Sequence, residues 1–162
     1  MTVVECVPNF SEGRRPEVVD EIVAAVAAVS GVHVLDRQSD ATHNRSVITF
    51  AGPGEAVAEA AFGGVAVAAR LIDLNAHEGA HPRFGAADVV PFVPLKDDDM
   101  AACVALARGL GARVAAELEI PVYFYEEAAR SEGRRNLAVV REGGFEGLRE
   151  AIGRDQIGRA HV

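Results

Sequence analysis

Short β-branched runs alternate along the chain with longer stretches of apolar residues at helical spacing. In Pro16–Ser30 the apolar residues recur every three to four positions, which predicts a helix with one buried face. Two further helices are predicted over the alanine-rich stretches Glu55–Leu74 and Met100–Glu119. Short apolar or alternating runs predict five strands: Thr2–Val7, Val32–Asp36, Arg45–Ala51, Val89–Val93 and Val122–Tyr125.

Polar segments separate these elements. The pattern predicts a turn over Phe10–Gly13, a polar loop over Arg37–His43, a surface turn or short helix over Glu126–Arg135 and a short helix over Phe145–Ile152. The first six elements follow the order strand, helix, strand, strand, helix, strand, as in the ferredoxin-like split βαβ unit. We therefore expect an α+β fold: a βαββαβ sheet extended by an extra helix and strand, with the helices packed on the sheet.

Composition and charge narrow the possible partners. With 162 residues, 49% of them apolar, the chain is expected to form one domain with its own core. The formal net charge of −8 argues against nucleic acid as a partner, because phosphate binding needs a basic surface. Cys6 and Cys103 lie in apolar segments without a CxxC pair, so two buried thiols are expected. The chain shows neither an N-terminal signal pattern nor a run of about 18 apolar residues, which predicts a cytoplasmic protein without a membrane span.

The end of the chain departs from this pattern. Gln156–Val162 shows no hydrophobic periodicity and no link to the residues before it. Its letters IGRAHV are what one reading frame of a widely used sequencing adapter encodes. We therefore expect this tail to be non-native, and residues 1–155 to be the domain that the fold and site predictions concern.

Titratable side chains are densest in His77–Pro94, a segment interrupted by glycine and proline. His77 and His81 are four positions apart, a spacing that suits a metal site on a helix, but the glycines and Pro82 argue against a helix. An imidazole on a loop can instead act as a general acid or base near neutral pH. The alternative is a solvent-exposed loop histidine, or one that hydrogen-bonds a loop carbonyl, without a chemical role.

Two other polar segments can contribute to a site. In Val7–Gly13 a strand leads into a helix, and the turn offers N–H groups to an anionic ligand. Asn9 and Ser11 can add side-chain hydrogen bonds, although both residues also suit a simple turn.

The second of these segments runs from Asp36 to Arg45. A carboxylate such as Asp40 can fix the tautomer of His43, and Arg45 beside Asn44 can bind a carboxylate through two hydrogen bonds. The alternative is a charged hairpin loop.

Long motifs in these segments are specific enough to indicate a family. The chain carries VECVPNFSEG at residues 4–13, HNRSV at 43–47, HEGAHPRFGAADVVPFVP at 77–94 and PVYFY at 121–125. With these motifs the sequence, from Thr2 to about Arg149, resembles glutamate formiminotransferase. That family is the folate enzyme of histidine degradation, which is also found fused to a cyclodeaminase.

The resemblance implies transfer of a formimino group between 5-formiminotetrahydrofolate and L-glutamate, with tetrahydrofolate as the carrier and no metal. The catalytic histidine of the family corresponds to His81, which would accept and donate the proton of the amine that gains or loses the one-carbon group. The residues expected to contact folate, glutamate or formiminoglutamate are Asn9, Ser11, Asp40, His43, Asn44, Arg45 and His77. Arg83 and Asp88 are expected to support the loop.

In the family a second ferredoxin-like subdomain follows, and the active site lies in the groove between the two. We expect this chain to lack that subdomain and therefore to have little or no transferase activity as given, and we expect the intact protein to be a homo-oligomer. Two other functions remain open. One is a non-catalytic folate-binding or assembly module of the same fold, and the other is a metal-dependent hydrolase using His77, His81 and Asp88. His81→Ala separates them: loss of transfer with folate binding retained indicates acid/base chemistry, whereas loss of bound metal together with activity indicates the hydrolase.

Overall fold

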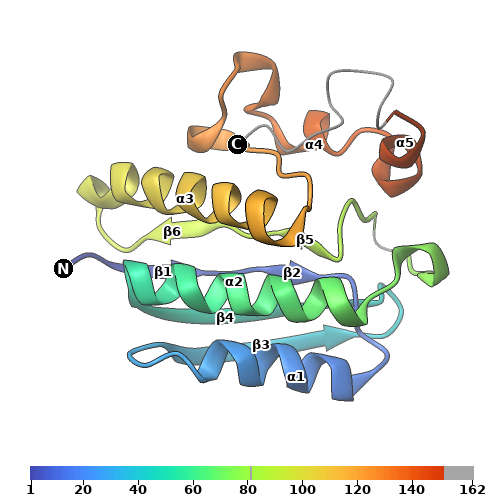
Figure 1. The fold of residues 1–162 in the computed structure, drawn as a ribbon, viewed down its shortest axis with the longest axis horizontal. Coiled ribbons are helices and arrows are strands. Elements are labelled where there is room, and N and C mark those ends of the chain that lie inside the picture. The colour runs from blue at the N-terminus through green and yellow to red at the C-terminus, as the bar shows by residue number, and fades with distance from the viewer. Residues whose placement is uncertain (81, 152–162) are drawn as a thin grey trace.

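An antiparallel sheet with three helices against one of its faces forms the body of the chain (Figure 1). The computed structural model describes residues 1–80 and 82–151. His81, Ile152 at the end of one predicted helix, and the tail Gln156–Val162 therefore lie outside the described residues. Within the described residues the fold is α+β, as the sequence predicted.

The described strands are β1 (Val3–Cys6), β2 (Asn9–Phe10), β3 (His33–Asp40), β4 (Arg45–Pro53), β5 (Ala87–Val89) and β6 (Phe92–Pro94). The described helices are α1 (Pro16–Ala27), α2 (Gly54–Leu71), α3 (Met100–Leu118), α4 (Leu137–Val140) and α5 (Gly144–Ala151). Short 3₁₀ turns occupy Leu74–Ala76, Asp97–Asp99, Glu126–Ala128 and Glu132–Arg134.

Two rows of the sheet each consist of two short strands that follow one another, β1 with β2 and β6 with β5. β3 pairs with β4, and β4 pairs with both β1 and β2. β1 pairs in turn with β6, and β2 with β5, and every pairing is antiparallel. The order across the sheet is therefore β3, β4, β1 with β2, and β6 with β5.

Two prolines interrupt two of these rows. Pro8 separates β1 from β2 and Pro91 separates β6 from β5, because proline has no N–H to donate to a neighbouring strand. Both carbonyl groups still accept hydrogen bonds: Pro8 from the N–H of Ile48 and Pro91 from the N–H of Val7, each at 3.2 Å. The single strand predicted over Val89–Val93 is thus corrected to two shorter ones.

The burial of β4 alternates along the strand and shows that the sheet has one covered and one open face. Ser46, Ile48 and Phe50 are fully buried, whereas Val47 and Thr49 are partly exposed. In Figure 1, α1, α2 and α3 lie side by side in front of the sheet. The helix side chains that complete the core include Val18, Val19, Ile22, Val26, Val57, Ala61 and Val65. We call the opposite face, over which no described helix lies, the helix-free face.

The strand predicted over Val122–Tyr125 is not formed. These residues pair with none of the described strands, and the side chains of Val122 and Phe124 lie against Gly111 of α3 instead. Phe124 is 6% exposed, and its ring lies where a Cβ on Gly111 would come within 2.6 Å. The predicted extra helix is present as α3, whereas the predicted extra strand is not formed.

β3 is longer than the strand predicted over Val32–Asp36, and it takes in the first part of the loop predicted over Arg37–His43. It continues to Asp40, which lies opposite Arg45 of β4. β3 is at the edge of the sheet and most of its residues are exposed. Such a strand lacks the apolar alternation by which strands are recognised in a sequence.

Two glycines of α3 are expected to respond in opposite ways to alanine. A Cβ on Gly109 meets no described atom within 4 Å, so Gly109→Ala is expected to stabilise the fold by about 0.5–1 kcal/mol through helix propensity. A Cβ on Gly111 would lie 2.6 Å from Phe124 and 3.1 Å from Val122, so Gly111→Ala is expected to destabilise it by about 1–3 kcal/mol. Urea unfolding compares the two variants. Equal stability of both would contradict the packing of Val122 and Phe124 on α3.

Candidate functional site

Asn44, in the turn between β3 and β4, ties three segments of the chain together. Its Oδ1 accepts a hydrogen bond from the N–H of Gly13 at 2.9 Å, and its Nδ2 donates to the carbonyl of Glu78 at 2.9 Å. The backbone carbonyl of Asn44 lies 3.1 Å from Nε2 of His77. Asn44 is 7% exposed with φ of +51°, a conformation that asparagine adopts more readily than most residues. One buried side chain therefore joins the turn after β2, the β3–β4 turn and the segment before residue 81.

Residues 77–88, of which residue 81 is not described, are called the histidine loop below. Its first part lies directly against the β3–β4 turn. The N–H of Ala80 donates to the carbonyl of Thr42 at 3.1 Å. A Cβ on Gly79 would lie 2.5 Å from the carbonyl oxygen of His43, an approach that only glycine permits. Backbone contact and Asn44 together hold this part of the loop.

Ser11 and Asp88 hold the second part of the histidine loop. Ser11 Oγ donates to the carbonyl of Gly85 at 2.8 Å, and its N–H donates to the carbonyl of Ala86 at 2.9 Å. The carboxylate of Asp88 is 4% exposed and accepts hydrogen bonds from the N–H groups of Phe84 and Gly85. Asn44 therefore holds the loop before residue 81, and Ser11 and Asp88 hold it after.

Arg83 connects the histidine loop to α5. Its Nη2 donates to the carboxylate of Glu146 at 2.8 Å, and its carbonyl accepts from the N–H of Phe145 at 3.0 Å. The guanidinium lies 5.6 Å from the centroid of the Phe145 ring. Hydrogen bonds from its own backbone N–H and from Arg83 lower the pKa of Glu146. Arg83 thus helps to hold α5 against the histidine loop.

A polar cavity of about 310 Å³ lies beside His77. It is lined by Glu12, Arg14, Arg15, Asn44, Leu71, Asp73, Ala76, His77 and Glu78. Nδ1 of His77 is buried and has no hydrogen-bond partner among the described residues, whereas Nε2 contacts Asn44. The ring of His77 therefore helps to hold the histidine loop against the β3–β4 turn.

Glu12 was not among the site residues predicted from the sequence, yet it organises the entry to α1. It is 3% exposed, and its carboxylate accepts from the N–H groups of Arg14 at 2.8 Å and Arg15 at 2.9 Å. Nε of Arg15 donates to it at 2.7 Å. Burial alone would raise the pKa of Glu12, but these hydrogen bonds lower it overall.

The lowered pKa of Glu12 makes a prediction about stability and pH. A carboxyl group whose pKa is lower in the folded state stabilises the fold above its unfolded pKa, and that contribution is lost as the pH falls. We expect Glu12→Gln to destabilise the fold at pH 7 by about 2 kcal/mol, because charge-assisted hydrogen bonds are lost. The difference from wild type should shrink below the ordinary glutamate pKa of 4.5. Urea unfolding between about pH 7 and pH 3 measures it, and a difference independent of pH would contradict the role of the charge.

Three predicted site residues share the helix-free face. Asn9 lies opposite Val47 in the sheet, and Val47 shares its face with Arg45 because side chains two positions apart on a strand point the same way. Arg45 is paired with Asp40 of β3. Asn9, Arg45 and Asp40 therefore lie on one face, at the end of the sheet where the β3–β4 turn contacts the histidine loop.

Asp40 and His43 form a pair within the β3–β4 turn. Oδ1 of Asp40 accepts from the N–H of His43 at 2.8 Å, and Oδ2 lies 3.1 Å from Nδ1 of its ring. The backbone hydrogen bond, followed by the one from the ring, lowers the pKa of Asp40. The ionised carboxylate favours the tautomer of His43 that carries its proton on Nδ1.

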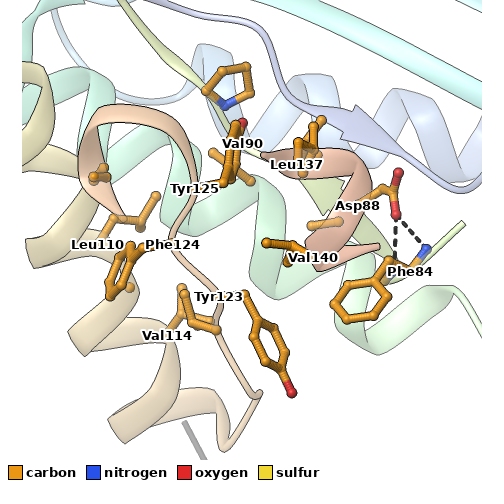
Figure 2. Close-up of a pocket in the computed structure, with 18 of the residues that line it drawn as sticks. Phe84, Asp88, Val90, Leu110, Val114, Tyr123, Phe124, Tyr125, Leu137 and Val140 are labelled. Atoms are coloured by element: carbon orange, nitrogen blue, oxygen red, sulfur yellow. Dashed lines mark hydrogen bonds between the residues drawn. The ribbon is translucent and has the colours of Figure 1, made fainter. Parts of the chain in front are cut away.

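A larger cavity, of about 630 Å³, lies on the helix side of the sheet between α3 and the C-terminal segment (Figure 2). The residues labelled in Figure 2 show its largely apolar lining, with Leu110 and Val114 from α3 and Leu137 and Val140 from α4. Burial raises the pKa of Tyr125, on the same wall, to about 12. That phenol therefore stays neutral in the physiological range.

Residues 1–80 and 82–151 contain neither a cluster of metal ligands nor a membrane-spanning helix. No group of three or more histidine, cysteine, aspartate or glutamate side chains comes together in a way that suits a metal ion. No helix in those ranges combines the length and apolar character needed to cross a bilayer. The predicted hydrolase site includes His81, which lies outside those residues.

The structure separates the predicted site residues into groups. Hydrogen bonds of Ser11, Asn44, His77 and Asp88 hold the histidine loop in place. A second group, on the helix-free face and in the β3–β4 turn, consists of Asn9, Asp40, His43 and Arg45. Arg83 belongs to neither group and contacts α5. Sequence reasoning missed Glu12 and Arg141. An acid just before the proline that begins a helix was an available signal for Glu12. Arg141 had none, because its partner Asp88 is 53 positions away.

Comparison with known proteins adds an independent observation. The family model for the formiminotransferase domain, N-terminal subdomain, matches residues 3–161. Glutamate formimidoyltransferase of Thermoplasma acidophilum is 55% identical over 154 residues, which cover 94% of this chain and 51% of that protein. The glutamate formimidoyltransferase of Streptococcus pyogenes serotype M1 is 47% identical over 150 residues, 93% of this chain and 50% of that protein. Formimidoyltransferase-cyclodeaminase of Sus scrofa is 48% identical over 150 residues, 93% of this chain and 28% of that protein. The chain thus spans about half the length of the first two relatives.

Proposed function

Because the chain belongs to the family of formiminotransferase N-terminal subdomains, we propose that it contributes the acid/base side of a site that transfers a formimino group between 5-formiminotetrahydrofolate and L-glutamate. The observation that carries the proposal is the histidine loop, held on both sides of residue 81 at one end of the helix-free face. His81 is the proton carrier in this proposal, and tetrahydrofolate carries the transferred group without a metal.

Formimino transfer exchanges one amine for another at the formimino carbon. The incoming amine attacks that carbon, and the nitrogen of the resulting tetrahedral adduct must lose a proton. The leaving amine must gain a proton before its C–N bond breaks. One imidazole can carry the proton from the first nitrogen to the second, because its ordinary pKa lies near neutrality. His81 has this role whether the group moves toward tetrahydrofolate or toward glutamate.

The contacts of the histidine loop support this role, because acid/base catalysis requires a group held within hydrogen-bond reach of the reacting nitrogen. Asn44 and Gly79 hold the loop before residue 81, and Ser11 and Asp88 hold it after. Both Oδ1 and Nδ2 of the Asn44 side-chain amide already make hydrogen bonds within the chain. Asn44, Ser11 and His77 therefore position the loop in this proposal more than they contact substrate.

The helix-free face is the proposed surface for folate and glutamate. Both ligands carry carboxylates, which an arginine binds well, and Arg45 is placed on this face beside Asn9. Asp40, ionised and paired with His43, is suited to the amine end of the substrate. The net charge of −8 makes a local arginine important for an anionic ligand.

We propose that the sheet is of the ferredoxin-like type. The order β3, β4, β1 with β2, and β6 with β5, all antiparallel, supports this topology. α1 joins the row of β1 and β2 to β3, and α2 joins β4 to the row of β5 and β6. We further propose that the intact protein is cytoplasmic and forms a homo-oligomer. In it, the rest of the protein covers the helix-free face.

A transfer assay tests the proposed function. We define the joined protein as this chain linked to the half of the Thermoplasma acidophilum relative that it does not cover. The joined protein is expected to move the formimino group from formiminoglutamate to tetrahydrofolate, and to keep its activity after treatment with EDTA. Folate binding without transfer would favour a non-catalytic module, and hydrolysis abolished by EDTA would favour a metal-dependent hydrolase.

A further inference from the structure

The guanidinium of Arg141, at the C-terminal end of α4, contacts the histidine loop at two points. Its Nη2 donates to the carbonyl of Pro82 at 2.8 Å and to the carboxylate of Asp88. Asp88 in turn accepts from the N–H groups of Phe84 and Gly85. The guanidinium of Arg141 therefore connects Pro82 to the carboxylate of Asp88, which itself holds the backbone of Phe84 and Gly85.

This contact is shielded from water. The side chain of Asp88 is 4% exposed and that of Arg141 is 22% exposed. Hydrogen bonds between a guanidinium and a carboxylate are stronger than neutral ones, and they are stronger again where water is excluded. Removing Arg141 would leave a buried carboxylate without its counter-charge, which is a costly arrangement.

The rest of the C-terminal segment brings Arg141 to this position. We call residues 136–149 the strap. Figure 2 shows Leu137 and Val140 of α4 beside Phe84 and Asp88 at the cavity. The side chain of Asn136 begins α4 by accepting from the N–H of Ala138 at 2.9 Å. The apolar contacts of α4 and this cap fix the end of the helix from which Arg141 reaches the loop.

Further along, the strap contacts the loop in two more places and the preceding turn, Leu74–Ala76, in one. The N–H of Phe145 donates to the carbonyl of Arg83 at 3.0 Å, Glu146 accepts from the Arg83 guanidinium at 2.8 Å, and Arg149 donates to Asn75 at 3.2 Å. Of these contacts, only that of Arg141 reaches the carbonyl directly after residue 81 and the buried Asp88 together.

We propose that Arg141 is a positioning residue for the reaction: by holding Pro82 and Asp88 it fixes the backbone to which His81 is joined. The catalytic part of this inference rests on the proposed function, whereas the holding of the loop does not. In this proposal Arg141 does not contact any reacting atom. Its loss should therefore lower the rate of transfer more than the affinity for either substrate.

The test compares Arg141→Met and Arg141→Lys with the control Arg135→Met. Arg135 lies in the same part of the chain and forms an exposed ion pair with Glu127, away from the histidine loop. Hydrogen exchange of the amides of residues 83–88 in this chain is expected to become about tenfold faster in Arg141→Met, because the loop opens more often. The ¹⁵N imidazole signal of His81 is expected to shift in the same variant. Both should stay unchanged in Arg135→Met, and Arg141→Lys should restore part of the protection.

Kinetics in the joined protein separate this inference from the proposed function. Arg141→Met is expected to lower kcat by about 10- to 100-fold with KM nearly constant, because a small misplacement of a catalytic group is costly. Unchanged exchange and an unchanged His81 signal in Arg141→Met would overturn the inference, as would full kcat. If the loop loosens while the wild-type joined protein transfers nothing, the holding role stands and the proposed function fails. Should Arg141→Met not fold, Arg141→Lys and Asp88→Asn supply the same readouts.

Discussion

Replacing His81 by asparagine is expected to lower kcat for formimino transfer by about 10²–10⁴-fold, which is the usual contribution of a general acid/base. Asparagine keeps a polar side chain of similar size but cannot take up and return a proton near neutral pH. KM for tetrahydrofolate and for formiminoglutamate should change little, because the proposed role is in the reaction step. Steady-state kinetics on the joined protein measure both quantities.

The matched control is His33→Asn. His33 lies at the end of β3 opposite to Asp40 and the β3–β4 turn, and it is exposed. Its replacement should leave kcat within about twofold of wild type, as expected for a surface substitution. Equal activity of His81→Asn and wild type would remove His81 from the mechanism. A loss of folate binding in His81→Asn would instead make it a ligand contact.

Gly79→Ala is expected to have the second large effect. A new Cβ would lie 2.5 Å from the carbonyl oxygen of His43 and 2.9 Å from Cβ of Asn44. Backbone atoms form this wall, so the histidine loop must move away, at a cost of about 1–3 kcal/mol in the free energy of unfolding. Such a shift should lower kcat of the joined protein by about 10²-fold, because the loop carries the proposed acid/base.

Gly133→Ala provides the control for Gly79→Ala, since a Cβ there meets no described atom within 4 Å. Its stability should stay within about 0.5 kcal/mol of wild type. Urea unfolding and steady-state kinetics of both variants check the prediction. A Gly79→Ala protein with wild-type stability and kcat would show that the loop does not depend on the β3–β4 turn.

The elements with strong periodicity could be predicted from the sequence. α1 begins at Pro16 as predicted, and β4 shows the expected alternation from Arg45 onward. The error over Val122–Tyr125 has a physical cause: an apolar run predicts burial, but whether it is buried in a sheet or against a helix depends on distant residues such as Gly111. β3 was predicted too short because an edge strand is exposed on both faces and can be polar throughout.

The site could be predicted only where its residues lie in contiguous motifs. Asn44 and Ser11 could be named as candidates because each stands in such a motif. Their detailed contacts were not predictable, since a buried asparagine that joins three segments has the same sequence signal as one that makes a turn. Arg141 shows the limit most clearly: its contacts with Pro82 and Asp88 arise from the way α4 packs over the cavity.

The position at which tetrahydrofolate binds tests whether the helix-free face is the substrate surface. Amide spectra of the ¹⁵N-labelled joined protein, recorded during titration with tetrahydrofolate, report which residues the ligand reaches. Shifts are expected at Asn9, Arg45 and the histidine loop on the helix-free side of the sheet. Shifts confined to Tyr123, Val140 and their neighbours in the cavity on the helix side would contradict the proposed substrate surface.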